Sequence, residues 1–156
     1  MAVTGDCARE PAAEMFDLAN FLPYLLNRAG ARLAIAWTQE SRQLGVALQE
    51  WRVLAALLSR QPQRMSELAA MTTIDRTTLS RLVSRMEENG LVSRGRSGED
   101  GREVQIELTE KGVKVGNGML PLAGRYENTA LEGFTPAEAR AFKDMLKRVF
   151  DNLDRL

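Results

Sequence analysis

Hydrophobic positions recur with the period of an α-helix over much of the chain. Residues 23–43 carry an apolar stripe, with a proline suited to the first helical turn and Gly45 placed to end the helix. A second stripe predicts a helix at residues 48–60, which Gln61-Pro62-Gln63 ends. Residues 1–21 hold a short apolar cluster and leave two options open, a further helical turn or an arm packed on a partner.

Two helices are predicted to meet across a tight turn in the middle of the chain. Ser66 can cap a short helix over residues 67–71, residues 72–74 form the turn, and Asp75 can cap a longer helix that ends at Asn89-Gly90. The longer helix separates an apolar stripe from a face of Arg, Ser and Thr. The stripe consists of Leu79, Leu82, Val83 and Met86.

Beyond this helix the pattern changes to the period of two that is typical of strands. Residues 92–96 and 103–108 flank a turn-rich segment, which predicts a β-hairpin. The second strand alternates, so we expect Val104, Ile106 and Leu108 to face inward. The expected fold class is therefore mainly α with a small β-hairpin.

The C-terminal third is predicted to be helical. Thr109 can cap a helix that three glycines weaken and Pro121 should kink, which makes residues 116–121 the expected hinge. Thr135 and Glu138 form a capping box for a last helix that runs to the C-terminus. One small chain cannot easily cover the apolar face of this helix, so we expect a partner subunit there. The face consists of Phe142, Met145, Leu146, Val149, Phe150 and Leu153.

The composition argues against most enzyme classes. The 156 residues include no histidine and one cysteine, which removes histidine-based acid–base chemistry, zinc fingers and intramolecular disulfides. Glu87 and Glu88 face different ways on a helix, and Glu99 and Asp100 share one loop with no further ligand nearby, so we expect no catalytic activity, no metal and no cofactor. The chain has no apolar run of bilayer length and no evident signal peptide, which favours a cytoplasmic protein without a membrane partner.

The net charge of zero is an average over unlike segments. Residues 1–50 carry four basic and six acidic side chains, a net charge of −2, and residues 97–156 carry nine and eleven, again −2. Residues 51–96 carry eight arginines and four acidic side chains, a net charge of +4. A solvated charged face is one interpretation of this segment, and a phosphate-binding surface is the other, because arginine pairs well with phosphates and guanine edges.

A helix, a turn, a capped helix and a β-hairpin in this order form a winged helix-turn-helix. Such a fold places the second helix in a major groove and the wing in the adjacent minor groove of double-stranded DNA. Short hydrogen-bonding side chains and arginines suit both positions. The expected contacts come from Arg76, Thr77, Thr78, Ser80 and Arg81 in the helix and from Arg96 and Arg102 in the wing. Asp100 is expected to pair with a wing arginine and stabilise the loop.

Several short motifs follow one another in a fixed order along nearly the whole chain. They are Phe21-Leu22-Pro23-Tyr24-Leu25-Leu26-Asn27-Arg28, Glu50-Trp51-Arg52-Val53-Leu54, Ser66-Glu67-Leu68-Ala69, Ile74-Asp75-Arg76-Thr77-Thr78-Leu79-Ser80-Arg81-Leu82-Val83, Asn89-Gly90-Leu91-Val92, Asp100-Gly101-Arg102 and Leu108-Thr109-Glu110-Lys111-Gly112. No single motif is specific. Their order and spacing together resemble the MarR (multiple antibiotic resistance regulator) family of bacterial transcription factors.

The resemblance implies a winged helix-turn-helix DNA-binding domain at residues 46–109. Residues 1–45 and 110–156 would form the helical dimerisation region of an obligate homodimer, and the dimer would bind a palindromic operator, usually as a repressor. It also implies that Arg102 reaches the minor groove. The full set of expected DNA-binding residues is Ser66, Arg76, Thr77, Thr78, Ser80, Arg81, Ser84, Arg85, Arg96, Ser97 and Arg102.

The resemblance also implies control by a small-molecule effector, since many relatives release DNA when an aromatic acid enters a crevice beside the DNA-binding domain. The candidate ligand-binding residues are Tyr24, Asn27, Arg28, Arg32, Trp51 and Arg52. An arginine would be the natural partner for a carboxylate. Two alternatives stay open, a core position for Trp51 and ion pairs for Arg28 and Arg52. Relatives that sense peroxide use a cysteine in an early core helix, whereas Cys7 lies in the N-terminal segment, so we expect no thiol switch.

A winged helix that binds only other proteins is the main alternative function, because a fold does not fix a function. A protein-docking wing would be expected to carry apolar anchors where this chain has Arg81, Arg96 and Arg102. The arginines therefore favour DNA, and the salt dependence of binding to duplex DNA distinguishes the two functions.

Overall fold

A computed structural model describes residues 16–97 and 103–155 of the chain. The helices and strands predicted from the sequence are present, and their boundaries differ from the prediction by at most two residues except in the last helix, which ends at Leu153 and was expected to run to the C-terminus. The helices are α1 (Leu22–Ser41), α2 (Leu48–Ser59), α3 (Met65–Thr72), α4 (Arg76–Glu88), α5 (Glu110–Ala130) and α6 (Pro136–Leu153). The strands are β1 (Gln63–Arg64), β2 (Val92–Ser97) and β3 (Glu103–Leu108), and short 3-10 turns occupy Leu18–Asn20 and Arg42–Leu44.

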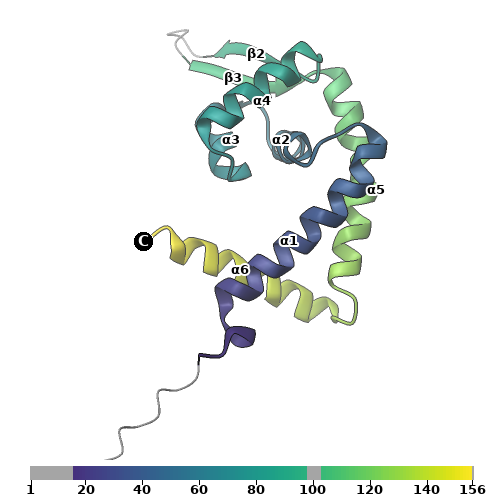
Figure 1. The fold of residues 1–156 in the computed structure, drawn as a ribbon. Coiled ribbons are helices and arrows are strands. Elements are labelled where there is room, and N and C mark those ends of the chain that lie inside the picture. Colours follow the sequence, from purple (N-terminus) through teal and green to yellow (C-terminus); the bar gives the residue numbers. More distant parts are fainter. Residues whose placement is uncertain (1–15, 98–102, 156) are drawn as a thin grey trace, which may run out of the picture.

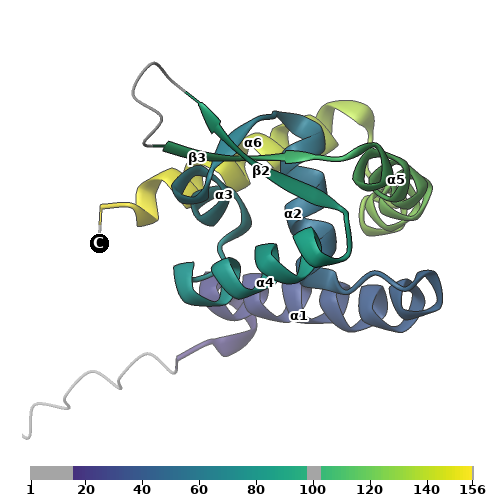
Figure 2. The ribbon, with the colours of Figure 1, turned by 90° about the horizontal axis from the view of Figure 1, so that it is seen from above.

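The elements form a compact lobe and an extended helical part. Helices α2, α3 and α4 pack with β2 and β3 in the lobe, whereas α1, α5 and α6 extend away from it (Figure 1). Figure 2, turned by 90°, shows α5 nearly end-on beside the strands. The start of α5 and the end of α1 join the lobe to the extended part, so both carry the connection between them.

The sheet contains a strand that the sequence did not predict. Within the described residues, the antiparallel order is β1-β3-β2, with Gln63 opposite Ile106 and Val92 opposite Leu108. A strand of two residues is too short to show alternation, which explains why β1 escaped prediction. The fold class is nevertheless as expected, mostly helical with a small antiparallel sheet that forms the wing.

The core lies in the lobe and is built from the predicted stripes. The apolar stripe of α4 is buried, with Leu79, Val83 and Met86 fully enclosed. These residues pack with apolar side chains of α2, α3 and the sheet in one continuous cluster. Fully buried leucine and valine side chains contribute about 1.5–3 kcal/mol each relative to exposed ones, so the α4 stripe fixes which face of the helix points outward.

Two local expectations were wrong. Ser66 does not cap α3, because the helix begins at Met65 and its N-cap residue is Arg64, whose backbone N–H donates to the Glu67 carboxylate over 2.8 Å. Val104 does not face a core either, since its side chain is 47% exposed, while Ile106 and Leu108 on the same strand are buried. The strand extends past the end of the lobe at Val104, so alternation persists there without an interior to pack against.

Apolar faces of α1 and α6 remain exposed in the single chain, as expected for α6. The residues of α6 include no buried side chain, and Phe150 and Leu153 are more than half exposed. On α1, Ile35 is 64% exposed. No helix among the described residues is both long and apolar enough to cross a bilayer.

Candidate nucleic-acid interface

The outward face of α4 gathers the polar residues that the sequence assigned to DNA. Because the apolar stripe is buried, the opposite face of the helix is exposed to solvent. The exposed residues are Arg76, Thr77, Thr78, Ser80, Arg81 and Arg85. Ser66, on α3, is also exposed, and Ser84 is half-buried. The helix thus presents two hydroxyl-bearing threonines near its N-terminus and arginines along its length, which matches the chemistry of base edges and phosphates.

Asp75 fixes the start of α4. Its carboxylate accepts a hydrogen bond of 2.9 Å from the backbone N–H of Thr78, as an N-cap residue does. Hydrogen bonds from the Thr78 side chain and backbone lower the pKa of the Asp75 carboxyl below its ordinary value of 3.8. The carboxylate is therefore charged at neutral pH, and it favours the positive end of the helix dipole.

Replacing Asp75 with alanine is expected to lower the thermal midpoint at pH 7, because the cap hydrogen bond is lost. A lowered pKa in the folded state stabilises the fold above the ordinary pKa, and this contribution disappears as pH falls through the folded-state value. The difference in midpoint between the two proteins should therefore be constant above about pH 5 and shrink below pH 3.8. Circular dichroism melts across this range measure it. An Asp75→Asn variant, which retains a capping side chain, is the control, and an unchanged midpoint for alanine would contradict the role of the cap.

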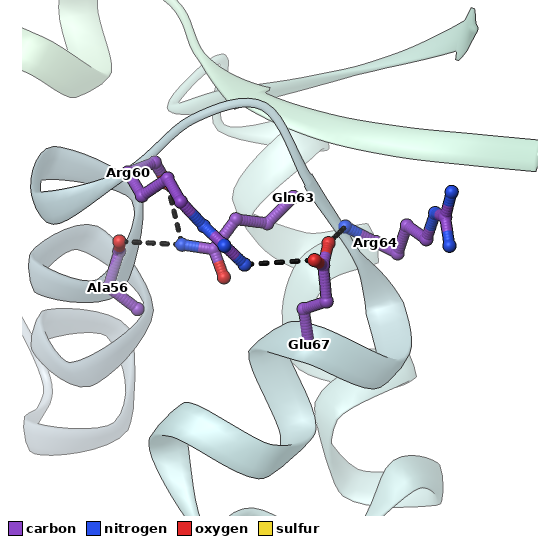
Figure 3. A network of polar contacts seen from close by, with 5 residues as sticks. All are labelled: Ala56, Arg60, Gln63, Arg64 and Glu67. Carbon is purple, nitrogen blue, oxygen red and sulfur yellow. Dashed lines mark hydrogen bonds and ion pairs between the residues drawn. The ribbon is translucent and has the colours of Figure 1, made fainter. Parts of the chain in front are cut away.

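Polar contacts around Glu67 hold α3 against the end of α2 (Figure 3). The side-chain amide of Gln63 is fully buried and donates to the carbonyl oxygens of Ala56 at 2.7 Å and Arg60 at 2.6 Å. The Glu67 carboxylate accepts from Arg60 at 2.8 Å and from the backbone N–H of Arg64 at 2.8 Å. The hydrogen bonds from Arg60 and Arg64 lower the pKa of Glu67, the backbone bond from Arg64 most of all. The network orients the first helix of the helix-turn-helix.

The wing begins at the C-terminal end of α4 and continues along β2 and β3. Backbone pairing places Arg96 opposite Val104 and Ser97 opposite Glu103. The Arg96 and Ser97 side chains, with Asp100 and Arg102, lie outside the residues whose side chains the structure describes. Their roles in the minor groove and in the wing loop therefore stay predictions. At the base of the wing, Arg94 donates to the Ser84 hydroxyl and pairs with Glu87, both on α4.

The start of α5 is fastened to the end of α4. The Thr109 hydroxyl donates to the carbonyl oxygen of Gly90 over 2.6 Å, and the Lys111 ammonium donates to that of Asn89 over 2.8 Å. A Cβ atom on Gly112 would lie 1.9 Å from the carbonyl oxygen of Leu91, which no other residue than glycine permits. The glycine was expected to weaken α5, and the structure shows that it allows this close approach as well.

A crevice opens between the lobe and the extended helices. It has a volume of about 520 Å³ and is lined by α1, α2, α5 and α6, within the range of small-molecule sites. Its aromatic wall consists of Trp51 stacked on Trp37, with ring centroids 5.3 Å apart, and Tyr126 edge-on to Trp37 at 5.5 Å. Burial first, and then a hydrogen bond to Glu40, raise the pKa of the Tyr126 phenol.

The structure brings only some of the predicted ligand-binding residues together. Trp51 and Arg52 line the crevice, and Trp51 is half-buried at the edge of the core. Arg28 and Arg32 line a surface hollow on α1, where the Arg28 guanidinium lies 5.3 Å from the ring centroid of Tyr24. Arg32 also lines a pocket between α1 and α5 that includes Tyr126. Tyr24 and Asn27 line none of the described pockets. Among the described residues, neither Arg28 nor Arg52 forms an ion pair.

Sequence reasoning missed three residues that shape the crevice. Trp37 was assigned only to an apolar stripe, yet its indole N–H is buried without a hydrogen-bond acceptor among the described residues. Tyr126 and Lys143 also line the crevice, and Lys143 pairs there with Glu127. Tyr126 lies far along the chain from Trp37 and Trp51, so no local sequence pattern could predict that the three rings share one crevice. The aromatic character of these three residues was the only indication in the sequence.

Comparisons with known proteins agree with this arrangement. The family model described as MarR family matches residues 44–103. The chain is 29% identical over 152 residues to the HTH-type transcriptional repressor IacR of Pseudomonas putida, covering 97% of this chain and 91% of the relative.

Solved structures share the fold over nearly their whole length. A crystal structure of a MarR family transcriptional regulator from Silicibacter pomeroyi superposes with a TM-score of 0.80 at 28% identity, covering 87% of this chain and 92% of that one. Bordetella bronchiseptica BpsR, whose structure concerns regulation of DNA binding by 6-hydroxynicotinic acid, superposes with a TM-score of 0.70 at 24% identity, covering 82% and 97%. Together with the matched motifs and the winged helix-turn-helix described above, these likenesses show that the chain is similar to MarR family regulators over most of its length, and that residues 44–103 match the family model.

Proposed function

We propose that the protein is a sequence-specific DNA-binding transcriptional repressor that a small-molecule ligand releases from its operator. The observation that carries this proposal is the exposed, arginine-rich face of α4, held outward by the buried stripe behind it. Helices of this kind dock in the major groove through their N-terminal residues. The relatives named as transcriptional repressors support the same function. It is a role in regulation and not in catalysis, and its expected place is the cytoplasm.

We propose further that the DNA-binding form is a homodimer that reads a palindromic operator. The exposed apolar faces of α1 and α6 support this, because a second copy would cover them by symmetry. Two copies of α4 would then lie in successive major grooves about 34 Å apart. A mass measurement by light scattering during gel filtration gives the number of subunits, and a monomer at micromolar concentration would exclude the dimer.

Selection of bound duplexes from a random pool tests DNA binding directly. We expect a palindrome to emerge, with half-sites about one helical turn apart. The affinity of the selected duplex should fall steeply as salt is raised, since phosphate contacts release counterions. Binding that is independent of salt, or a pool that yields no common sequence, would contradict the proposal and favour a protein-binding winged helix.

The ligand site that we propose is the crevice of Trp37, Trp51 and Tyr126. Aromatic rings suit a planar ligand, and the exposed Arg52 guanidinium has no ion-pair partner among the described residues, so it is available to a carboxylate. The unpaired indole N–H of Trp37 supports a ligand that accepts hydrogen bonds. Aromatic acids have both properties. The relative whose DNA binding 6-hydroxynicotinic acid regulates adds support for this chemical class.

Replacing Arg52 with glutamine is expected to reduce release by an aromatic acid without changing DNA affinity in the absence of ligand. A charge-assisted hydrogen bond contributes about 1.5–3 kcal/mol, so the ligand concentration for half release should rise by at least about tenfold. A panel of aromatic acids that includes 6-hydroxynicotinic acid is titrated against the complex with the selected duplex. Arg28→Gln, in the hollow on α1, is the matched control. A response lost in the Arg28 variant and kept in the Arg52 variant would move the site to α1.

A further inference from the structure

The base of the wing is tied to α4 by one arginine side chain. Arg94 on β2 donates from Nη2 to the Ser84 hydroxyl over 2.9 Å and pairs through Nη1 with the Glu87 carboxylate over 3.1 Å. Both partners lie on α4, three residues apart and therefore on one face of the helix. The Arg94 and Glu87 side chains are 31% and 39% exposed, so the pair is partly shielded from solvent.

This contact occupies the Ser84 hydroxyl and the Arg94 guanidinium, two groups that could otherwise bind DNA. The single proton of the Ser84 hydroxyl is donated to the carbonyl oxygen of Ser80 over 3.0 Å, and an Arg94 N–H occupies an acceptor position of the same oxygen. Ser84 thus has no free donor for a phosphate. Arg94, one of the eight arginines of the basic segment, is directed to α4 as well.

Arg94 lies where β2 passes from the core to solvent. Val92 at the start of the strand is buried in the core, whereas Val104, opposite Arg96, is already exposed. Arg94 lies between them, opposite the buried Ile106. Among the described residues, the contacts of Arg94 with Ser84 and Glu87 are therefore the side-chain contacts between the wing and α4 that lie nearest to the wing tip.

Glu87 occupies a place where a carboxylate is unfavourable on its own. It lies in the last turn of α4, where the helix dipole repels negative charge, on a helix whose outer face would approach phosphates. The positive charge of Arg94 offsets both the unfavourable interaction of Glu87 with the helix dipole and its repulsion of phosphates. Glu88, the next residue, has no ion-pair partner among the described residues and so carries the same charge without the link.

We infer that Arg94, held by Ser84 and Glu87, is a positioning residue that sets the orientation of the wing relative to α4 and thereby the discrimination between specific and non-specific DNA. The inference rests on the proposed function. The link fixes the two DNA-contacting elements as one rigid unit, so that the wing meets the minor groove when α4 is seated in the major groove. Non-specific binding depends on phosphate charge and does not require the wing and α4 to enter their grooves at the same time.

The test compares Glu87→Gln with Glu88→Gln, two variants that remove the same charge from neighbouring positions. Affinities are measured for the selected duplex and for a scrambled duplex of equal composition. Glu88→Gln should strengthen binding to both by a similar factor, since repulsion of phosphates falls. Glu87→Gln should lower the ratio of specific to non-specific affinity roughly threefold to tenfold, in the lower part of the range for residues in contact. Exchanging the charges in an Arg94→Glu, Glu87→Arg double variant should restore most of the ratio.

Amide hydrogen exchange of the free protein provides a second measurement that needs no DNA. Exchange in β2 and β3 should be faster in Glu87→Gln than in Glu88→Gln, with equal thermal midpoints. Identical affinity ratios in the two variants would overturn the inference, as would faster exchange with an unchanged ratio. If the unmodified protein selects no duplex, the proposed function fails instead, and the exchange result alone decides whether the link orders the wing.

Discussion

Replacing Gly112 with alanine is expected to destabilise the protein by about 3 kcal/mol, near the upper end of the usual cost of overpacking. The new Cβ atom would lie 1.9 Å from the carbonyl oxygen of Leu91, and a backbone atom cannot turn away as a side chain can. The start of α5 would have to move, which would break the 3.1 Å hydrogen bond from the Thr109 backbone N–H to the same carbonyl. Urea unfolding gives the free energy, with unchanged slope if both proteins unfold in one step.

Gly118 on the same helix provides the matched control. A Cβ atom at this position meets nothing within 4 Å, so Gly118→Ala should leave stability unchanged or raise it by up to about 1 kcal/mol through better helix propensity. Equal unfolding midpoints for the two alanine variants would show that the contact between Gly112 and Leu91 is looser than the structure has it.

Replacing Arg81 with alanine is expected to cause the largest loss of sequence-specific DNA binding. Arg81 is exposed on the outer face of α4, one turn from the helix start. A bidentate contact between arginine and guanine contributes about 1–3 kcal/mol, so affinity for the selected duplex should fall by at least about tenfold. Because base contacts carry the sequence information, the variant should also accept changes at particular base pairs. Competition binding with single-base variants of the duplex measures both effects.

The control for Arg81 removes an equal charge far from α4. Arg140 is exposed near the start of α6, and Arg140→Ala should change affinity by less than about twofold, as expected for a distant charge screened by salt. A similar loss in both variants would mean that net charge governs binding. Unchanged selectivity in Arg81→Ala, with affinity reduced, would assign this arginine to phosphates.

The parts of the fold that sequence could predict are those with a local signal. The Asp75 cap and the stripe from Leu79 to Met86 each depend on neighbours within one or two helical turns, and both are confirmed. The capping box of Thr135 and Glu138 is confirmed for the same reason. Local chemistry of this kind determines where a helix begins and which face it buries.

The features that sequence could not predict depend on contacts between distant segments. The two-residue strand β1 exists because Gln63 and Arg64 pair with β3, more than 40 positions away. No sequence pattern distinguishes Arg94 from the other arginines of the basic segment. Its ion pair with Glu87 forms because the fold brings β2 next to α4. Alternation predicted an interior beneath Val104, but alternation says nothing about where the core ends.

The junction between α4 and α5 connects the end of α4, the helix proposed to contact DNA, directly to α5. Thr109 and Lys111 donate to the carbonyl groups of Gly90 and Asn89, the two residues directly after α4, so the end of α4 and the first turn of α5 are connected by side-chain hydrogen bonds. A tilt of α5 would therefore also move α4. Because α5 lines the crevice, a ligand bound there could cause such a tilt. In a two-fold assembly, a few degrees of tilt in each subunit would add, and the separation of the paired reading helices would no longer match the helical repeat of DNA.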